Sequence, residues 1–205
     1  MICDIMGVPK SDEHLIFDWS NRAIGILDPD FNDSIDSGVA NLMQIFAYGQ
    51  QMADDRRKCP HADLMSAMVH SQAEGEGEQI PQYLMDGFFL LMVIAGNETT
   101  RNSISGGMLA LMEHPDERQK LIDNLGLIPT GVEEILRYVS PVLHMRRTAT
   151  KDTQLHGVDI AEGDKVVMWY PAANRDERVF DDPETFNVSR QPNDHLAFGI
   201  GRHRC

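Results

Sequence analysis

The sequence predicts a mainly helical fold with a small β region. Apolar residues recur at helical spacing to about residue 140, whereas short apolar segments bounded by glycines dominate from about residue 141. The 205 residues are 42% apolar and 24% charged, which is ordinary globular composition. Because the chain is long enough for one sizeable core, we expect a single domain over residues 1–205.

Charge and cysteine content narrow the class of protein. The formal net charge is −14, from 32 acidic and 18 basic residues, which argues against a nucleic-acid partner. The cysteines, Cys3, Cys59 and Cys205, form no disulfide framework and suit a reducing cytoplasm. No signal peptide is predicted, and the longest apolar run, residues 88–96, is shorter than the ~20 residues of a membrane span. We expect a cytoplasmic protein without a membrane span.

Two helices are predicted in the first third of the chain. Asp36 is placed to cap the first helix, and a solvated loop at residues 74–78 follows the second, which covers residues 61–73. The apolar positions of the first helix, which recur near every 3.6 residues, are Val39, Leu42, Met43, Ile45 and Phe46.

A long third helix and a shorter fourth helix should follow. Pro81 suits the first turn of the third helix, which we expect to reach about His114. Residues 84–95 are apolar except for Asp86, and a helix that is apolar all round is a buried one. Residues 130–133 form a capping box for the fourth helix, which ends before a proline.

The character of the sequence changes after Pro141. Turns at Gly157 and Gly163 separate short apolar segments, which are typical of strands. The predicted strands are residues 153–155, 158–160 and 165–170. Residues 172–205 are rich in Pro, Asn, Asp and Gly, and we expect an ordered loop with short helical turns.

Residues 95–100, Ala-Gly-Asn-Glu-Thr-Thr, place polar groups inside the predicted buried helix. Gly96 removes a side chain, while Glu98 and Thr99 need partners or a purpose if they are buried. Threonine hydroxyls can also turn back onto helix carbonyls and loosen the ladder, which often marks a functional site. The alternative is a helix whose buried face simply ends at Asn97.

Glu134 and Arg137 form a second motif, because residues at i and i+3 share one helix face and can pair. An apolar stripe occupies the opposite face of the same helix and consists of Val132, Ile135, Leu136 and Val139. On this pattern alone, the pair is a solvated surface pair that contributes little stability.

The third motif is the Gly-rich segment 198–205, which ends at Cys205. Glycines let a backbone approach a flat ligand closely, and the cations Arg202 and Arg204 favour the thiolate, the species that ligates iron.

Two other interpretations of Cys205 remain open. It could be a structural cysteine at a turn, or it could join His195 and His203 in a zinc site. Zinc usually takes four ligands with paired close spacings, and no second close pair is present in the sequence.

The three motifs, in this order, resemble those of the cytochrome P450 superfamily. Residues 95–100 are similar to its oxygen-activating helix, and Glu134 and Arg137 match its Glu-x-x-Arg helix. The residues that match its haem loop are Phe198, Gly201, His203 and Cys205. Residues 180–186, followed by Arg190, resemble its meander segment. The resemblance covers essentially the whole chain and implies the cytochrome P450 fold, which we expect to be incomplete at both ends.

The resemblance implies haem b, iron protoporphyrin IX, as the cofactor, with Cys205 as its axial thiolate ligand. Thr99 and Glu98 would relay protons to bound oxygen. Arg147 and His203 match positions that bind the haem propionates, and an arginine fork suits a carboxylate. Further haem contacts are implied for Ala95, Gly96, Phe198 and Gly201.

The resemblance also reverses the interpretation of the second motif. It implies that Glu134 and Arg137 are buried and form a structural network with Arg190 or its neighbours.

Residues 97–103, 144–149 and 164–170 are similar to bacterial subfamilies that oxidise terminal carbons of alkanes, fatty acids, methyl-branched lipids and sterol side chains. The implied reaction converts R–H, O2 and two electrons into R–OH and water, with electrons from a ferredoxin and its reductase. The residues expected to line a hydrophobic substrate pocket are Leu91, Ile94, Ala95, Leu143 and Met145.

Two alternative functions are weaker. A haem- or metal-binding helical protein without turnover, such as a sensor, has no need of Glu98 and Thr99 beside Gly96. A peroxide-driven haem-thiolate enzyme is also disfavoured, because the acid–threonine pair is suited to activating O2.

Overall fold

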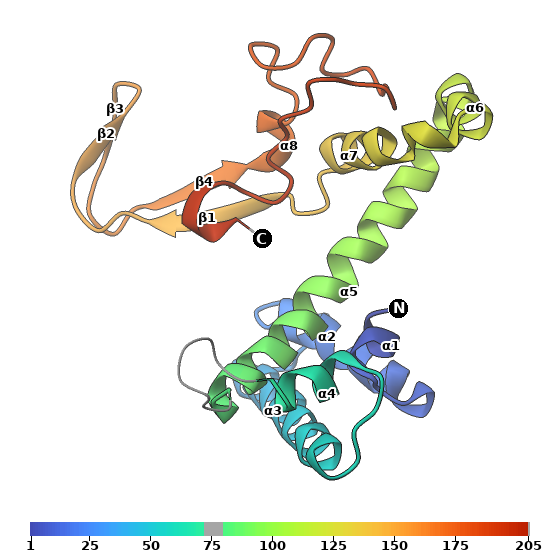
Figure 1. Ribbon diagram of the computed structural model, residues 1–205. Coiled ribbons are helices and arrows are strands. Elements are labelled where there is room, and N and C mark those ends of the chain that lie inside the picture. The colour runs from blue at the N-terminus through green and yellow to red at the C-terminus, as the bar shows by residue number, and fades with distance from the viewer. Residues whose placement is uncertain (72–79, 205) are drawn as a thin grey trace. The chain divides into compact units, whose positions relative to one another are not determined.

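The computed structural model describes residues 1–71 and 80–204. Its elements are mostly helices, with two small antiparallel sheets, and this confirms the predicted fold class (Figure 1). The chain divides into two compact units, Met1–Glu98 and Thr99–Cys205. In the described part of the chain, no helix has the length and apolarity that crossing a membrane requires.

The first unit packs helices around one apolar core. Its elements are α1 (Ile2–Met6), the 3-10 helix η1 (Lys10–Asp12), α2 (Glu13–Ile24), α3 (Ile35–Lys58), α4 (Leu64–Val69) and the first half of α5 (Gln82–Glu113). Ile16 of α2, Ile45 of α3 and Phe89 of α5 are almost fully buried in this core.

Helix α3 begins two residues earlier than its sequence pattern indicated. Ser34, not Asp36, is the N-cap: Ser37 N donates to Ser34 Oγ at 3.1 Å, and Ser34 N donates to Ser37 Oγ at 3.2 Å. The predicted cap was therefore wrong, because a reciprocal serine pair satisfies the free backbone N–H groups first. Of the predicted apolar face, Val39 and Met43 are exposed.

Helix α4 is shorter than the predicted segment 61–73. Asp63 caps it by accepting a hydrogen bond from Ser66 N at 2.7 Å, so the helix starts only at Leu64. The predicted loop 74–78 and Ala73 lie outside the described residues.

Helix α5 confirms the predicted long helix, since it follows Pro81 and ends just before His114. The expectation that its apolar segment is buried all round was wrong. Met85, Phe89 and Val93, spaced four residues apart, are buried, but Leu84 and Leu91 are exposed. Only one face of α5 therefore packs on the core of the first unit.

The second unit contains the remaining elements, which are the second half of α5, α6 (Pro115–Asp123), η2 (Leu125–Leu127), α7 (Ile128–Val139), β1 (His144–Thr148), β2 (Thr153–Leu155), β3 (Val158–Ile160), β4 (Lys165–Trp169), α8 (Tyr170–Ala173) and η3 (Gly201–His203). Strand β1 pairs with β4, and β2 pairs with β3 (Figure 1). The predicted strands are confirmed except at Tyr170, which starts α8, whereas β1 was not predicted. Gly157 and Gly163 have positive φ, as the turns require.

Helix α7 starts before the predicted capping box. Pro129 lies in its first turn, and Thr130 is already helical, with its Oγ1 donating to Leu127 O at 3.0 Å. The capping-box prediction was therefore wrong, because the chain enters α7 directly from η2. The helix ends at Val139, and Ser140 adopts a left-handed conformation with φ of 48°.

Candidate functional site

Glu134 and Arg137 are fully buried on α7, with 0% side-chain exposure. Arg137 Nε donates to Glu134 Oε2 and Arg137 Nη2 donates to Glu134 Oε1, both at 2.8 Å. This is a bidentate fork between guanidinium and carboxylate. The surface position that periodicity favoured was therefore wrong.

The remaining donors of Arg137 bind backbone carbonyls of the following loops. Nη1 donates to Asn174 O at 2.8 Å and Pro183 O at 2.7 Å, and Nη2 donates to Thr185 O at 3.1 Å. The structure thus gives the buried cation a full set of acceptors, and the segment 174–185 is tied to α7.

Arg190 joins the same carboxylate. Its Nε lies 3.2 Å and 3.1 Å from the two Glu134 oxygens, and its Nη1 donates to Asp181 O at 2.6 Å. Its Nη2 donates to Asp182 O at 3.1 Å and Thr185 O at 2.8 Å. The three predicted structural residues therefore lie in one buried network.

Sequence reasoning missed Asn174, which is fully buried beside this network. Its Oδ1 accepts from Leu196 N at 2.7 Å, and its Nδ2 donates to Ser140 Oγ at 2.9 Å. Asn174 therefore links the end of α7 to the segment that leads into the Gly-rich loop. No local pattern signals this role, because its partners lie 22 and 34 residues away in sequence.

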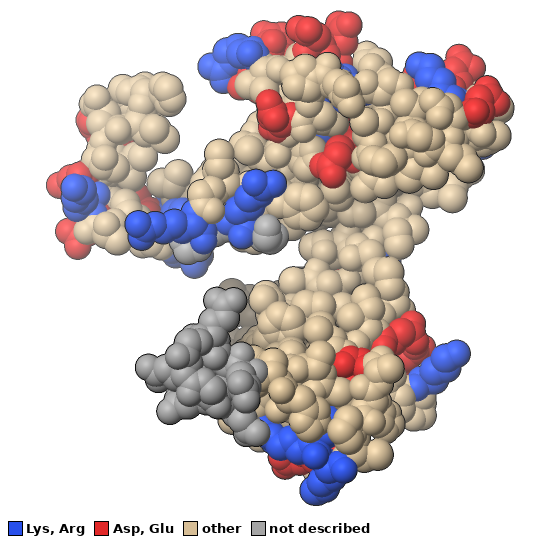
Figure 2. Space-filling model, in the orientation of Figure 1, with Lys and Arg blue, Asp and Glu red and all other residues tan. Residues whose placement is uncertain are grey.

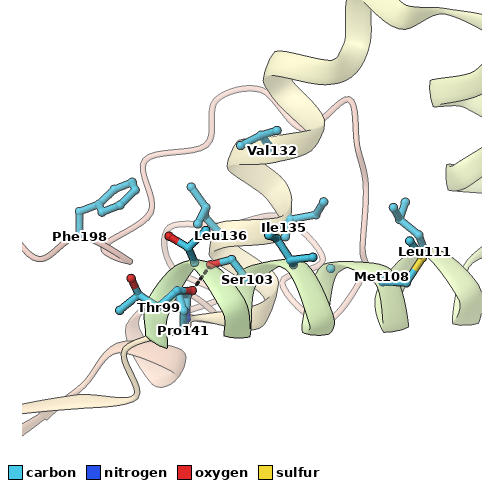
Figure 3. A pocket seen from close by; sticks show the side chains of 12 residues that line it. Thr99, Ser103, Met108, Leu111, Val132, Ile135, Leu136, Pro141 and Phe198 are labelled. Atoms are coloured by element: carbon cyan, nitrogen blue, oxygen red, sulfur yellow. Dashed lines mark hydrogen bonds between the residues drawn. The ribbon is translucent and has the colours of Figure 1, made fainter. Parts of the chain in front are cut away.

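An apolar cavity of about 380 Å³ lies between α5 and α7 (Figure 3). Its lining residues are Thr99, Thr100, Ser103, Ile104, Gly107, Met108, Leu111, Val132, Ile135, Leu136, Pro141 and Phe198. The cavity brings together two predicted site residues, Thr99 and Phe198. The apolar stripe of α7 faces this cavity, which explains why Glu134 and Arg137, on another side of the helix, face the loops.

Ser103 Oγ donates to Thr99 O at 2.8 Å (Figure 3). Ser105 Oγ likewise donates to Arg101 O at 3.0 Å. Such bonds from a side chain to the carbonyl four residues earlier compete with the backbone ladder and bend helices. Two serine hydroxyls therefore make such bonds on the part of α5 that follows Glu98.

The preceding residues of the motif belong to the first unit. Glu98 is half-buried, and the hydrogen bond from Asn97 Nδ2 to the buried Ser20 Oγ, at 2.7 Å, ties this part of α5 to α2. Gly96 is half-buried, and a Cβ there would lie 2.9 Å from the Ile2 side chain. A glycine is thus required for close packing of α5 on α1.

The predicted substrate residues fall in both units. Leu91 and Ala95 are exposed and Ile94 is half-buried, all on the part of α5 in the first unit. Leu143 and Met145 are exposed at and beside strand β1 of the second unit, and neither lines the cavity.

The Gly-rich loop runs from Phe198 into η3. Gly199 and Gly201 have φ of +75° and +71°, which favours glycine at both positions. Arg202 and Arg204 are exposed, and His203 ends η3. Cys205, the predicted iron ligand, lies outside the described residues.

Arg147 is exposed on β1, and its Nη1 donates to Arg146 O at 3.0 Å. Lys and Arg side chains gather over the β1–β4 sheet, although the chain as a whole carries a net charge of −14 (Figure 2). This sheet therefore presents cationic donors that suit a carboxylate.

The structure gives His195, a ligand in the alternative zinc site, other partners. Its Nε2 lies 2.8 Å from Glu133 Oε2, and its Nδ1 accepts from Ala197 N at 3.2 Å. Within residues 1–71 and 80–204, no group of three or more His, Cys, Asp and Glu side chains is arranged to hold a metal ion.

Comparison with known proteins decides the family. Residues 14–205 match the model of the family described as Cytochrome P450. The chain belongs to the cytochrome P450 family. Membership implies a haem cofactor, and the order of the three sequence motifs agrees with it.

Two curated P450 relatives are similar over the whole chain. It is 48% identical over 207 residues to a methyl-branched lipid omega-hydroxylase of Mycobacterium tuberculosis, of which it covers 48%. It is 42% identical over 206 residues to a steroid C26-monooxygenase of Rhodococcus jostii, of which it covers 42%. The chain thus spans about half the length of the curated relatives it matches.

A solved P450 structure agrees with this fold. The cytochrome P450 of the Bacillus subtilis bacillaene polyketide synthase is 35% identical, with a TM-score of 0.88. The match covers 100% of this chain and 51% of that structure.

Proposed function

We propose that the full-length protein is a haem-thiolate monooxygenase that hydroxylates a lipid-like substrate with O2 and two electrons. The observation that carries the proposal is the cavity that is lined by both Thr99 of α5 and Phe198 of the Gly-rich loop. Family membership and the lipid and steroid hydroxylases among the relatives support it.

Three features of the described residues support haem binding. The cavity is lined mainly by apolar side chains, which suits an apolar ligand. The cationic β1 residue Arg147 can serve the acidic propionates. The Gly-rich loop allows close backbone approach, and Gly201 adopts positive φ there.

In this proposal the Cys205 thiolate would ligate the iron of haem b, and Arg147 and His203 would bind its propionates. Contacts with the ring would come from Phe198, Gly201, Ala95 and Gly96, as the resemblance to the family implies. When bound, the haem supplies the chemistry that activates O2 and accepts electrons. The protein supplies orientation, exclusion of water and protons.

Thr99 and Glu98 are proposed to deliver those protons. They are consecutive residues of α5, and a carboxyl and a hydroxyl group can pass protons through hydrogen bonds. Thr99 lines the cavity, and this supports a role in delivering a proton to a ligand there.

The proposed substrate is long and mostly apolar, and it is attacked near one end. Leu91, Ile94, Ala95, Leu143 and Met145 offer no charge to fix a polar group, so shape must select the reacting carbon. Each buried methylene contributes about 0.8 kcal/mol, and affinity should therefore rise with chain length until the pocket is full. We further propose a cytoplasmic location, with electrons from a ferredoxin and its reductase.

The test uses the full-length protein with a bacterial ferredoxin and its reductase. A fatty acid, an alkane and a sterol are each supplied, and products are identified by mass spectrometry. We expect hydroxylation near a chain end, and we expect Ala95→Phe to block it or move it to another carbon more than it weakens binding. Hydroxylation of a compact polar aromatic alone would contradict the lipid assignment, and haem binding without any product would favour a sensor.

A further inference from the structure

His195 is a buried histidine that the proposed reaction does not use. Only 4% of its side chain is exposed, although it lies in the irregular segment that leads to Phe198. Its Nε2 lies 2.8 Å from Glu133 Oε2 on α7, and its Nδ1 lies 3.2 Å from the backbone nitrogen of Ala197. Both ring nitrogens therefore have a partner, as burial of an imidazole requires.

These two contacts fix the position of the proton on the ring. Ala197 N–H donates to Nδ1, so Nδ1 carries no proton and Nε2–H donates to the Glu133 carboxylate. A carboxylate that holds one ring nitrogen of a histidine sets both its tautomer and its orientation. Glu133 thus makes His195 an acceptor for the backbone of the loop.

Neighbouring contacts hold the same segment to α7 and its surroundings. Asn193 Nδ2 donates to Glu134 Oε2 at 3.2 Å, and Leu196 N donates to Asn174 Oδ1 at 2.7 Å. His195 lies between these two anchor points. The two consecutive acids of α7 therefore have different partners. Glu134 neutralises buried arginines, whereas the contact of Glu133 is with His195.

The His195 ring also reaches the cavity lining. Its centroid lies 6.0 Å from that of Phe198, with an angle of 45° between the planes. Phe198 in turn lines the cavity together with Thr99. The Glu133 side chain is 54% exposed, whereas the His195 imidazole is shielded from water and also accepts the Ala197 N–H group.

We propose that Glu133 and His195 are positioning residues: they hold Ala197 and Phe198 so that the Gly-rich loop presents Cys205 to the haem. The second half of this statement rests on the proposed function, whereas the first half concerns the loop alone. Neither residue needs to touch the haem or the substrate.

Amide hydrogen exchange in the full-length protein tests the loop contact without reference to activity. In Glu133→Ala we expect the Ala197 amide to exchange about tenfold faster, as for a lost hydrogen bond of about 1.4 kcal/mol. Glu133→Gln keeps an oxygen that accepts from Nε2–H, so it should restore most of the protection. Glu177→Ala removes an exposed carboxylate of the same unit and should change nothing. Unchanged exchange at Ala197 in Glu133→Ala would overturn the proposal.

The carbon monoxide complex of the reduced protein tests the consequence for the haem. We expect Glu133→Ala and His195→Phe to lose part of the wild-type Soret band, and we expect Glu133→Gln to retain it. Loss of stability without any spectral change per bound haem would mean that the pair is merely structural. A Soret band that is unchanged in Cys205→Ala would contradict the proposed function. The hydrogen-exchange experiment would still decide the role of His195.

Discussion

Thr99 lines the same cavity as Phe198, and its carbonyl oxygen accepts the hydrogen bond from Ser103 Oγ. If the Thr99 hydroxyl delivers protons, the Thr99→Ala variant should keep its affinity for haem and substrate. More of its electrons should form hydrogen peroxide instead of hydroxylated product. We expect product per NAD(P)H to fall roughly tenfold or more, because a positioned proton donor contributes at least that factor.

Thr100→Ala provides the matched control for Thr99, because Thr100 is the next residue and lines the same cavity. Product and peroxide should both be measured at saturating substrate. The relay role is wrong if Thr99→Ala forms as much product per NAD(P)H as wild type does. It is also wrong if this ratio falls equally in both variants.

Glu134 neutralises two buried arginines, so its removal should destabilise the protein strongly. Glu134→Ala leaves Arg137 and Arg190 without their carboxylate, and breaking such a buried pair costs roughly 3–5 kcal/mol. Denaturant melts of the full-length protein measure the loss. Glu177→Ala, which is exposed, should cost no more than about 1 kcal/mol. Equal free energies of unfolding for the two variants would contradict the structural role of Glu134.

Arg137→Lys separates charge from geometry in the same network. The lysine keeps the positive charge, but one ammonium group cannot reproduce the fork on Glu134 and the bonds to Asn174, Pro183 and Thr185. We expect a loss of about 2 kcal/mol or more in the same melts. Wild-type stability would show that charge alone suffices.

Local sequence signals could predict some residue roles and not others. The glycine content of the Gly-rich loop agrees with its backbone, because Gly201 adopts a positive φ. The burial of Arg137 could not be read from periodicity, because its acceptors other than Glu134 are backbone carbonyls 37 to 48 residues away. Only the resemblance to a family indicated it. The α3 cap was missed because Ser34 and Ser37 satisfy each other reciprocally.

Three elements of the first unit meet at one ion pair. Arg56 of α3 donates from Nε to Asp63 Oδ2 at 2.6 Å and from Nη2 to Gly7 O at 2.8 Å. Asp63 also caps α4 through Ser66 N. Gly7 has φ of +78°, and a Cβ there would collide with the Asp63 side chain. The pair therefore fastens α1, α3 and α4 together.

This ion pair should make the protein sensitive to acid. Burial alone would raise the pKa of the Asp63 carboxyl, but hydrogen bonds from Ser66 and Arg56 outweigh burial and lower that pKa below its ordinary value of 3.8. A lowered folded-state pKa contributes stability above the unfolded pKa and loses it as pH falls through the folded value.

Asp63→Asn should therefore remove part of the acid dependence. We expect the variant to be less stable by about 1–3 kcal/mol near neutral pH, and we expect the gap to wild type to shrink below about pH 4. Denaturant midpoints across pH measure both effects, with the exposed Asp33→Asn as control. A gap that stays constant with pH would refute the linkage.

The helices were predicted better than the sheet, for a physical reason. Pro81 and Pro115 are local signals, and α5 lies between them as expected. Strand β1, His144–Thr148, has no alternating pattern and exists because it pairs with β4, for example Met145 with Met168. Long-range pairing of this kind leaves no mark in a short window of sequence.

At the scale of the molecule, the site combines a cationic loop with an acidic chain. Arg202 and Arg204 are exposed and precede the proposed ligand Cys205 in the sequence, within a protein of net charge −14. Local cations favour a thiolate, whatever the total charge. The proposed activity of the full-length protein therefore depends on whether this thiolate binds the haem iron.

The carbon monoxide spectrum of the reduced full-length protein tests that claim most directly. The Soret band of wild type is compared with that of Cys205→Ala and of Cys59→Ala, an exposed cysteine of the first unit. The account predicts that Cys205→Ala moves or abolishes the wild-type band, while Cys59→Ala leaves it unchanged. A band in Cys205→Ala identical to that of wild type would contradict the haem-thiolate assignment.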